Sequence, residues 1–401
     1  MSHEQVIRVV YQPQAVFRVR SVTRCSNSMT GHNGAILHTH FSADGKRLAS
    51  GGGDGTVRLW DTLTCTPLKT LKGHKNWVMA VAWAPDGKIL VSGDSKGEIR
   101  MWDGETGKSH GKPLRGHTNY ISSLAWEPYH NTKECRRFCS GSKDGGVRVW
   151  DVAQRKCTLS MTSHTKGVTC VKWGCEGLIY SASQDRTIKV WDSARGILVR
   201  TLEGHAHWVN GLSLNVDYAL RIGPYNHKGT APTDEKERME AAKAKVKKVL
   251  KDNGLQYELL CSCSDDFTMF LWDPVRNKKP IVRMTGHQQP VNHVSFSPDG
   301  KYIASASFDN SVRLWNGRTG KFIARFLGHV QDVYMCAWSA DSRLLLSASK
   351  DSTLVVWNLK TKKIKNQLPG HADEVYAVDW SPDGQKVASG GKDKVLKVWV
   401  T

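Results

Sequence analysis

The residues of this sequence that could do chemistry together are a histidine, a serine and an aspartate, which recur at similar spacing along the chain. In their first occurrence they are His32, Ser50 and Asp54, the residue types of a hydrolase catalytic triad. A nucleophilic serine needs an exposed hydroxyl, an oxyanion hole and a substrate pocket, and a protein has no use for many copies of such a site. The recurrence therefore favours a structural role, and we expect no enzymatic activity.

The repeated unit begins at a Gly-His dipeptide and ends near a tryptophan. Seven units carry the dipeptide, and Ser163-His164 stands at the expected place in the fourth. The closing tryptophans are Trp60, Trp102, Trp150, Trp191, Trp272, Trp315, Trp357 and Trp399. Five of the seven intervals between them measure 41 to 43 residues, and the next residue is Asp in the first five units and Asn in the following two. This period and this dipeptide are typical of WD40 repeats, each of which forms a four-stranded blade. The sequence thus predicts an all-β, eight-bladed WD40 propeller over residues 15–401.

Polar residues at fixed distances from each tryptophan predict a hydrogen-bond network inside the blades. Serine lies ten residues before the tryptophan in all eight units, and aspartate lies six residues before it in seven. Buried polar groups need partners, which a chain of Trp, Ser, His and Asp side chains would supply. The tetrads expected in units one and six are His32, Ser50, Asp54, Trp60 and His287, Ser305, Asp309, Trp315. In unit two, Lys96 replaces the aspartate, so either Asp94 substitutes for it or this blade lacks the network.

The two ends of such an array must meet, because open ends would expose unpaired strand edges. Residues 395–400 read as the third strand of the last unit, and nothing follows them to form a fourth. Residues 15–22 (AVFRVRSV) read as an extra strand before the first Gly-His dipeptide. We therefore expect this N-terminal strand to complete the last blade, with residues 1–14 as the remnant of a linker.

An insertion interrupts the fifth unit, where the interval between tryptophans doubles although only one Gly-His dipeptide lies inside it. The insertion covers residues 217–256, between the first and second strands of the unit. Residues 233–252 predict an amphipathic helix, because Met239, Ala242, Val246 and Val249 recur at helical spacing and Asp234 suits its N-terminus. Its basic residues are Lys236, Arg238, Lys243, Lys245, Lys247, Lys248 and Lys251. They favour either RNA phosphates or an acidic partner, and the alternative is a solvated helix that packs on the propeller through its apolar stripe.

Loops at the rims of a propeller's central channel commonly carry recognition, since its strands are occupied with packing. Large aromatics at or beside the Gly-His turns are therefore candidate contacts, namely Trp77, Tyr120, Trp208, Phe308, Tyr334 and Tyr376. Basic residues beside the turn aspartates are a second set of candidates, namely Lys143, Arg186, Lys350, Lys392 and Lys394. For each of them the alternative is an ordinary solvated side chain.

Composition points to a basic intracellular protein. The chain has 57 Lys and Arg against 37 Asp and Glu, a formal charge of +20, which favours acidic proteins or nucleic acid as neighbours. Its ten cysteines show no disulfide framework and no zinc spacing, so we expect a reducing compartment and neither metal nor cofactor. No secretory signal and no run of 18 apolar residues is present, which predicts no membrane association.

Five segments of the sequence resemble the Notchless family of WD40-repeat proteins. They are VYQPQAVFRVRSVTRC (10–25), AWEPYH (125–130), YSASQDRTIKVW (180–191), SDDFTMFLW (264–272) and PGHADEVYAVDWSPDG (369–384). The similarity runs across nearly the whole chain, including the insertion. The resemblance implies a monomeric assembly factor of the nucleus and nucleolus that docks on the pre-60S particle, contacting ribosomal RNA and proteins.

In that family an N-terminal ubiquitin-like domain engages midasin, a giant AAA ATPase whose pulling drives remodelling and release. This sequence departs from the pattern because it starts at the linker, so we expect it to dock without being pulled. Glu4 survives from the junction, but we assign it no role in metal bridging. The family is also linked with Notch signalling, which leaves a second hypothesis open: a signalling adaptor that binds an acidic protein tail.

Overall fold

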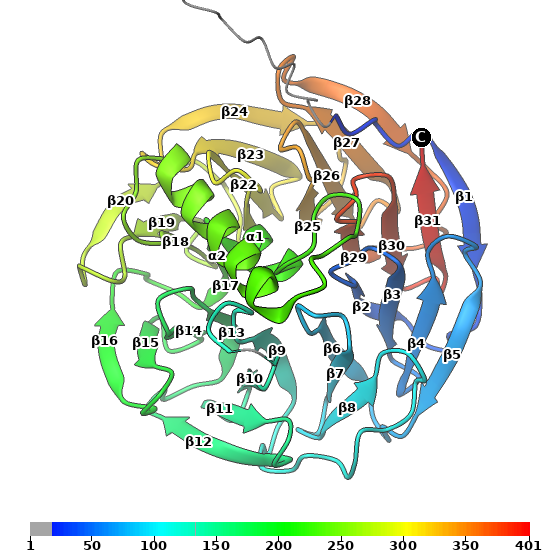
Figure 1. Ribbon diagram of the computed structural model, residues 1–401. Coiled ribbons are helices and arrows are strands. Elements are labelled where there is room, and N and C mark those ends of the chain that lie inside the picture. Colours follow the sequence, from blue (N-terminus) through cyan, green and yellow to red (C-terminus); the bar gives the residue numbers. More distant parts are fainter. Residues whose placement is uncertain (1–17, 133) are drawn as a thin grey trace, which may run out of the picture.

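The computed structural model describes residues 18–132 and 134–401, which form eight antiparallel sheets around a central axis (Figure 1). Blade one comprises β2 (Ile36–Phe41), β3 (Arg47–Gly52), β4 (Thr56–Asp61) and β5 (Pro67–Lys72), and blade two comprises β6 (Val78–Trp83), β7 (Ile89–Asp94) and β8 (Ile99–Asp103). Blade three comprises β9 (Ile121–Trp126), β10 (Arg137–Ser142), β11 (Gly146–Asp151) and β12 (Lys156–Thr162). Blade four comprises β13 (Val168–Trp173), β14 (Leu178–Ser183), β15 (Ile188–Asp192) and β16 (Leu198–Leu202). This arrangement confirms the predicted eight-bladed, all-β propeller.

The remaining blades follow in the same order around the ring. Blade five comprises β17 (Val209–Leu214), β18 (Leu260–Ser264), β19 (Met269–Trp272) and β20 (Pro280–Met284), and blade six comprises β21 (Val291–Phe296), β22 (Tyr302–Ser307), β23 (Ser311–Asn316) and β24 (Phe322–Leu327). Blade seven comprises β25 (Val333–Trp338), β26 (Leu344–Ser349), β27 (Leu354–Asn358) and β28 (Lys363–Leu368). Blade eight comprises β29 (Val375–Trp380), β30 (Val387–Gly391) and β31 (Leu396–Val400), with β1 (Arg24–Met29) at its outer edge.

Two opposite faces of the ring follow from this strand order. The first strand of each blade starts just after its Gly-His turn and ends at the loop that leads to the second strand, so these two kinds of loop lie at opposite ends of the blade. We call them the Gly-His face and the insertion face, because the insertion of blade five leaves from the second kind of loop. The core lies between neighbouring blades, where apolar side chains of adjacent sheets pack together.

Blade two has three strands, so the prediction of four strands in every unit is wrong there. An irregular segment replaces the fourth strand and covers the edge of β8. Ile99 and Leu114 exchange two backbone hydrogen bonds, the amide of His110 donates to the carbonyl of Met101, and the amide of Asp103 donates to the carbonyl of Lys108. The loop therefore satisfies the outward backbone groups that a fourth strand would pair.

The ring is closed by an N-terminal strand, but not by the predicted residues 15–22. Strand β1 pairs antiparallel with β31, from Arg24 opposite Val400 to Met29 opposite Leu396. Residues 18–22 are not a strand, and residues 1–17 lie outside the described part of the chain, as does the linker predicted over 1–14. Instead of pairing as a strand, this segment buries Val19 and Val22 against blades seven and eight.

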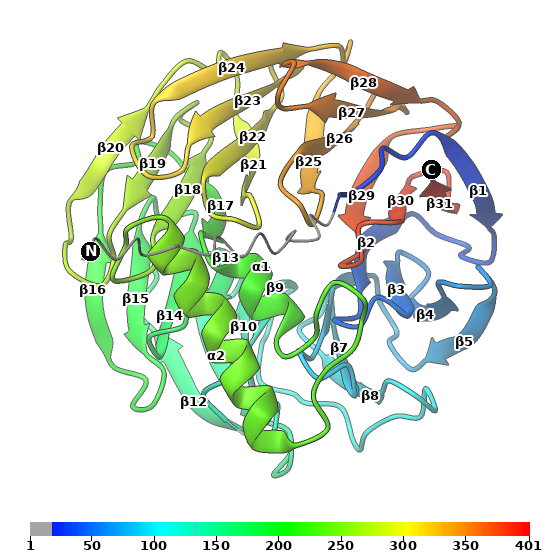
Figure 2. The same ribbon diagram turned by 45° about the horizontal axis from the view of Figure 1, so that its top comes forward.

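The insertion of blade five forms two helices, α1 (Asp217–Ile222) and α2 (Glu235–Asp252), which lie across one end of the ring (Figure 2). The predicted helix is confirmed as α2. Its N-cap Asp234 accepts hydrogen bonds from the backbone of Lys236 and Glu237, and Gly254, with a φ of +62°, ends it. Helix α1 was not predicted. No helix among the described residues is long and apolar enough to cross a membrane.

Candidate partner-binding surfaces

The recurring His, Ser, Asp and Trp side chains are joined by hydrogen bonds in each of the eight blades of the described ring. In blade six, the indole N–H of Trp315 donates to Ser305 at 3.0 Å, Ser305 lies 2.8 Å from Nε2 of His287, and Nδ1 of His287 lies 2.8 Å from Asp309. The same bonds link Trp60, Ser50, His32 and Asp54 in blade one. Each of these serines is fully buried, which removes the exposed hydroxyl that a nucleophile needs.

The electrostatics of the network fix its protonation. Burial alone raises the pKa of the Asp309 carboxyl, but hydrogen bonds from His287 and Ser311 outweigh it and hold that pKa well below its usual range. Burial lowers the pKa of the His287 ring, which therefore stays neutral. An ionised aspartate only accepts, so Nδ1 of His287 carries the proton and Nε2 accepts from the Ser305 hydroxyl. The network thus tethers the second and third strands of a blade to the Gly-His turn.

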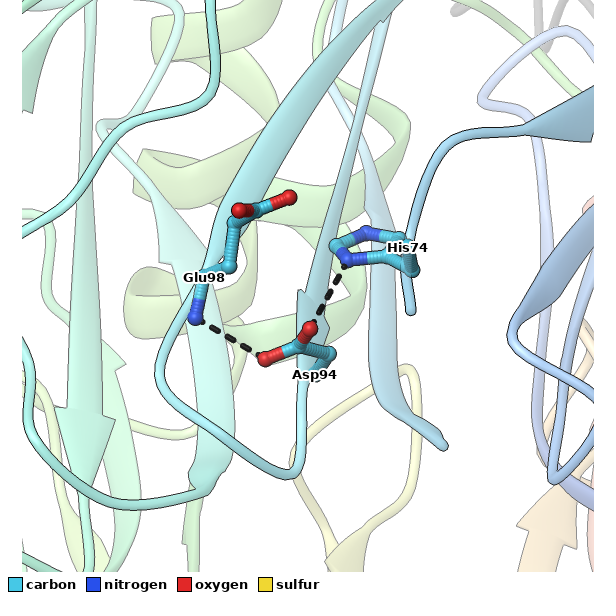
Figure 3. Close-up of side chains that lie close together, drawn as sticks. All are labelled: His74, Asp94 and Glu98. Carbon is cyan, nitrogen blue, oxygen red and sulfur yellow. Dashed lines mark hydrogen bonds and ion pairs between the residues drawn. The ribbon is translucent and has the colours of Figure 1, made fainter. Parts of the chain in front are cut away.

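In blade two Asp94 takes the place of the expected aspartate, which settles the alternative left open by the sequence. Its carboxylate lies 3.3 Å from Nδ1 of His74 and accepts the backbone N–H of Glu98 at 2.9 Å (Figure 3). The ligand atoms of His74, Asp94 and Glu98 lie within 4.8 Å of one another, a spacing that could hold a cation. The Glu98 carboxylate, however, pairs with Arg100 at 2.8 Å and Arg115 at 3.6 Å. We therefore assign these groups to the blade's own network.

The insertion is anchored to blades on several sides of the channel. From α1, the Tyr218 hydroxyl donates to the carbonyl of Pro382, and the Arg221 guanidinium makes a two-pronged ion pair with Asp379 in β29. Tyr225, in the following loop, donates to the carbonyl of Asp86 in blade two. Beyond α2, the Asn253 amide donates to the carbonyl of Asp299 in blade six at 2.7 Å. These contacts fix α2 across the insertion face.

The apolar side of α2 packs on the ring, with Ala242, Val246 and Leu250 buried and Met239 and Val249 partly buried. Two of its seven basic residues also face inward. Arg238 donates to the carbonyl of Pro232, and Lys245 donates to the carbonyls of Gly223 and Tyr225, where burial lowers the pKa of its ammonium group to about 8. The five other basic residues are exposed and form what we call the lysine face: Lys236, Lys243, Lys247, Lys248 and Lys251.

The candidate aromatics lie on the Gly-His face, opposite the lysine face. Three of them form a row over blades six to eight, because Phe308 meets Tyr334 with ring centroids 5.9 Å apart and Tyr334 meets Tyr376 at 5.5 Å. The Trp77 side chain is 60% exposed and Trp208 is 39% exposed, while Tyr120 is half-buried. The structure therefore groups three of the six aromatics and leaves the others apart.

The basic rim candidates carry less free charge than the sequence suggested. Lys350 lies 3.7 Å from Asp332, and Lys392 lies 3.3 Å from Asp373. The ammonium group of Lys143 lies 5.5 Å from the centre of the Trp208 ring and also donates to Gln184. Arg186 and Lys394 are exposed residues of tight turns, with φ values of +74° and +65°.

Comparison with known proteins agrees with this architecture. The model of the WD domain, G-beta repeat family matches residues 23–61, 65–103, 108–151, 155–192, 278–316, 320–358 and 362–400. The chain is 56% identical over 303 residues to Protein Notchless of Drosophila melanogaster, covering 74% of this chain and 61% of that protein. It is 52% identical over 325 residues to Ribosome assembly protein 4 of Saccharomyces cerevisiae (80% and 63%) and 57% identical over 322 residues to the Notchless protein homolog of Arabidopsis thaliana (80% and 67%).

The chain belongs to the Notchless family of WD40-repeat proteins. It spans between three fifths and two thirds of the length of these relatives. Among solved structures, the computationally designed Ika8 protein resembles this Notchless-family chain with a TM-score of 0.73 and 26% identity, covering 93% of this chain and 98% of that one. That likeness agrees with the propeller fold.

Sequence reasoning missed the residues that anchor the insertion of this Notchless-family propeller. Asp379 breaks the apolar pattern of its strand, VYAVDW, and a charged residue at such a position signals a partner. Its partner Arg221 lies in the last turn of the short helix α1, which has too few residues to show a helical period. The pairing could not be found from spacing, because the two residues are 158 positions apart.

Proposed function

We propose that this chain is a non-catalytic docking factor in assembly of the large ribosomal subunit, and that it binds pre-ribosomal RNA through the lysine face. The names of its relatives support a role in ribosome assembly, since two of them are called Ribosome assembly protein 4. The observation that carries the RNA contact is a helix fixed across one end of a rigid ring, with its basic side turned outward.

The charge distribution along α2 suits a polyanion. Its last ten residues carry five lysines and one aspartate. Among the described residues, no carboxylate lies within ion-pair distance of Lys243, Lys247, Lys248 or Lys251, so these side chains are available to pair with a partner. A lysine ammonium is a flexible point charge that binds phosphate without reading base sequence. The lysine face should therefore bind RNA electrostatically, with little sequence preference.

The Gly-His face would take protein partners in the same role. The exposed Trp77 and the half-buried row formed by Phe308, Tyr334 and Tyr376 are of the residue types that dominate protein interfaces. In this proposal the chain acts as a monomer in the nucleus and nucleolus. A midasin-type AAA ATPase would act on family members through the ubiquitin-like domain, which the family resemblance places before the propeller.

Sedimentation and RNA binding test this function. A tagged chain should co-sediment with pre-60S particles, and finding it only in free fractions would count against the proposal. The triple variant K243Q/K247Q/K251Q should lower the slope of log affinity against log salt for single-stranded RNA by about 2, because each lost phosphate contact contributes roughly 0.7. The matched control K69Q/K72Q/K156Q removes three exposed lysines from the outer strands β5 and β12 and should leave the slope unchanged. Equal slopes for the two triple variants would refute RNA binding by α2.

The second candidate function is the signalling adaptor that binds an acidic protein tail on the Gly-His face. The exposed aromatics favour a protein contact there. Acidic residues on the same face oppose an acidic tail, since Asp332, Asp373 and Glu374 already pair with Lys350 and Lys392. The two functions separate experimentally. Nuclease treatment releases an RNA-held chain and leaves a protein-held complex intact, and salt weakens the first steeply.

A further inference from the structure

The described structure holds a cavity of about 620 Å³ on the insertion face, between blades six and seven. Loops that follow β21, β25 and β27 form its walls, and the N-terminal segment before β1 forms another. Arg343 holds that segment in place, since it donates to Asp341 at 2.6 Å and to the carbonyl of Val19 at 3.0 Å. The Val19 amide donates to Asp341 as well, at 2.7 Å. The cavity is therefore built by residues from both ends of the chain.

The cavity combines an apolar floor with a positive rim. Tyr302, Ile323 and Leu359 line the floor and pack on the core of blades six and seven. Three exposed lysines stand around it: Lys301 in the loop after β21, Lys360 in the loop before β28, and Lys365 in β28 itself. Asp299 and Asp341 also line the cavity, where Asp299 accepts from Ser297 and Asp341 pairs with Arg343. Among the described residues, no carboxylate forms an ion pair with the three lysines. A ligand that matches such a site has a flat uncharged part and negative charge on either side of it.

The positive rim continues into the lysine face of α2. The Asn253 amide, at the C-terminus of α2, bonds the carbonyl of Asp299, which lies two residues before Lys301. Lys248 and Lys251, in the last turns of α2, thus lead towards the rim. One polyanionic strand could therefore cross the lysine face of α2 and reach the cavity beside Lys301.

We propose that this cavity binds one unpaired nucleotide of an RNA strand that also crosses α2. The base would lie on the floor beside Tyr302, and the flanking phosphates would meet Lys301, Lys360 and Lys365. Its volume lies within the range of roughly 300 to 1,000 Å³ that is usual for small-ligand sites. Single-stranded bases stack on aromatic side chains, and backbone lysine contacts track the strand. This inference rests on the proposed RNA-binding function and adds a second contact site to it.

Fluorescence anisotropy with a labelled 12-nucleotide single-stranded RNA tests the proposal on the full chain. The variant K301Q/K360Q/K365Q should bind about 60-fold more weakly at 0.15 M salt, because each of three lost phosphate contacts weakens binding about fourfold there. The control K69Q/K72Q/K156Q has the same net charge and should bind like the unmodified chain. With 4-thiouridine in the RNA, ultraviolet crosslinking followed by mass spectrometry should place an adduct on Tyr302.

The remaining outcomes separate the two proposals. If K243Q/K247Q/K251Q weakens RNA binding while K301Q/K360Q/K365Q behaves like the control, the cavity proposal is overturned and the lysine face of α2 stands. If neither variant differs from the control, both fail. A third outcome concerns a poly-glutamate peptide with the same charge as the RNA. If this peptide displaces the RNA, binds more tightly than the RNA does, and loses its affinity in K301Q/K360Q/K365Q, the occupant is an acidic protein and the nucleotide proposal is overturned.

Discussion

Replacing Asp379 by alanine should loosen the seam where the ring closes. Asp379 lies in β29 of blade eight, and its carboxylate accepts the backbone N–H of Phe41 in blade one at 2.8 Å. It also accepts two hydrogen bonds from Arg221 of the insertion, one of them at 2.7 Å. A single buried carboxylate thus joins blade eight, blade one and the insertion.

The size of the effect follows from what the substitution leaves behind. Removing one partner of a buried ion pair costs about 3 to 5 kcal/mol, and the lower value applies because 24% of the Arg221 side chain is exposed. The orphaned amide of the fully buried Phe41 adds about 1 kcal/mol. The free energy of unfolding should therefore fall by about 4 kcal/mol. At about 2 °C per kcal/mol for a domain of this size, Tm should fall by about 8 °C.

The matched control is Glu127→Ala in blade three. Glu127 is buried and makes a two-pronged ion pair with Arg137, at 2.6 and 2.9 Å, but both residues belong to one blade. Both variants should melt earlier, so hydrogen exchange read by mass spectrometry discriminates them. Asp379→Ala should speed exchange in β2, β29 and α1, and Glu127→Ala should speed it only around blade three. Unchanged exchange at β2 and β29, or a Tm within 1 °C of the unmodified chain, would show that Asp379 does not lock the seam.

Three further predictions concern pH, the tetrads and the closing strand. Burial lowers the pKa of His38 and of His293 to about 4, so both rings stay neutral in the folded chain at pH values where the unfolded chain takes up protons, near pH 6.5. The stabilisation from these two histidines should therefore be complete above pH 6.5 and decrease as the pH falls towards 4. Replacing both by asparagine should flatten the acid side of a plot of Tm against pH. Because Asp94 completes the network of blade two, His74→Ala and His287→Ala should lower stability by similar amounts of a few kcal/mol in thermal melts, and a difference above about 2 kcal/mol would contradict equal networks. Deleting β1 with everything before it should destabilise the ring far more than a deletion that stops before β1, as denaturant titration of the two truncated chains would show.

The number of blades and the tetrads could be predicted because the residues that determine them lie close together in the sequence of every repeat. Each network uses residues of one unit, so its residues recur at nearly constant spacing along the sequence. In unit two, where Lys96 stands at the aspartate position, Asp94 lies two positions away and takes that role. The closing strand could not be located in this way. Five of the six residues of β1 are exposed, and its place depends on backbone pairing with β31, which leaves no hydrophobic alternation.

The candidate surfaces were only partly predictable, because neighbours in space come from distant repeats. Helical spacing identified the buried side of α2, but its orientation depends on the contacts of α1 and the loops, which turn Lys245 inward. Tyr334 and Tyr376 are the second residues of β25 and β29, whereas Phe308 follows β22, so these three aromatics of successive blades meet only through the geometry of the ring. The cavity beside Lys301 requires the N-terminal segment as a wall, a contact across 322 positions from Val19 to Asp341.

The most direct test of the docking function is ultraviolet crosslinking of the tagged chain in growing cells, followed by sequencing of the bound RNA and mass spectrometry of the crosslinked peptides. We expect RNA of the large-subunit precursor, with adducts on peptides that cover α2, Glu235–Asp252, and these adducts should disappear in K243Q/K247Q/K251Q. Adducts confined to the Gly-His face, or recovery of no precursor RNA above background, would contradict it.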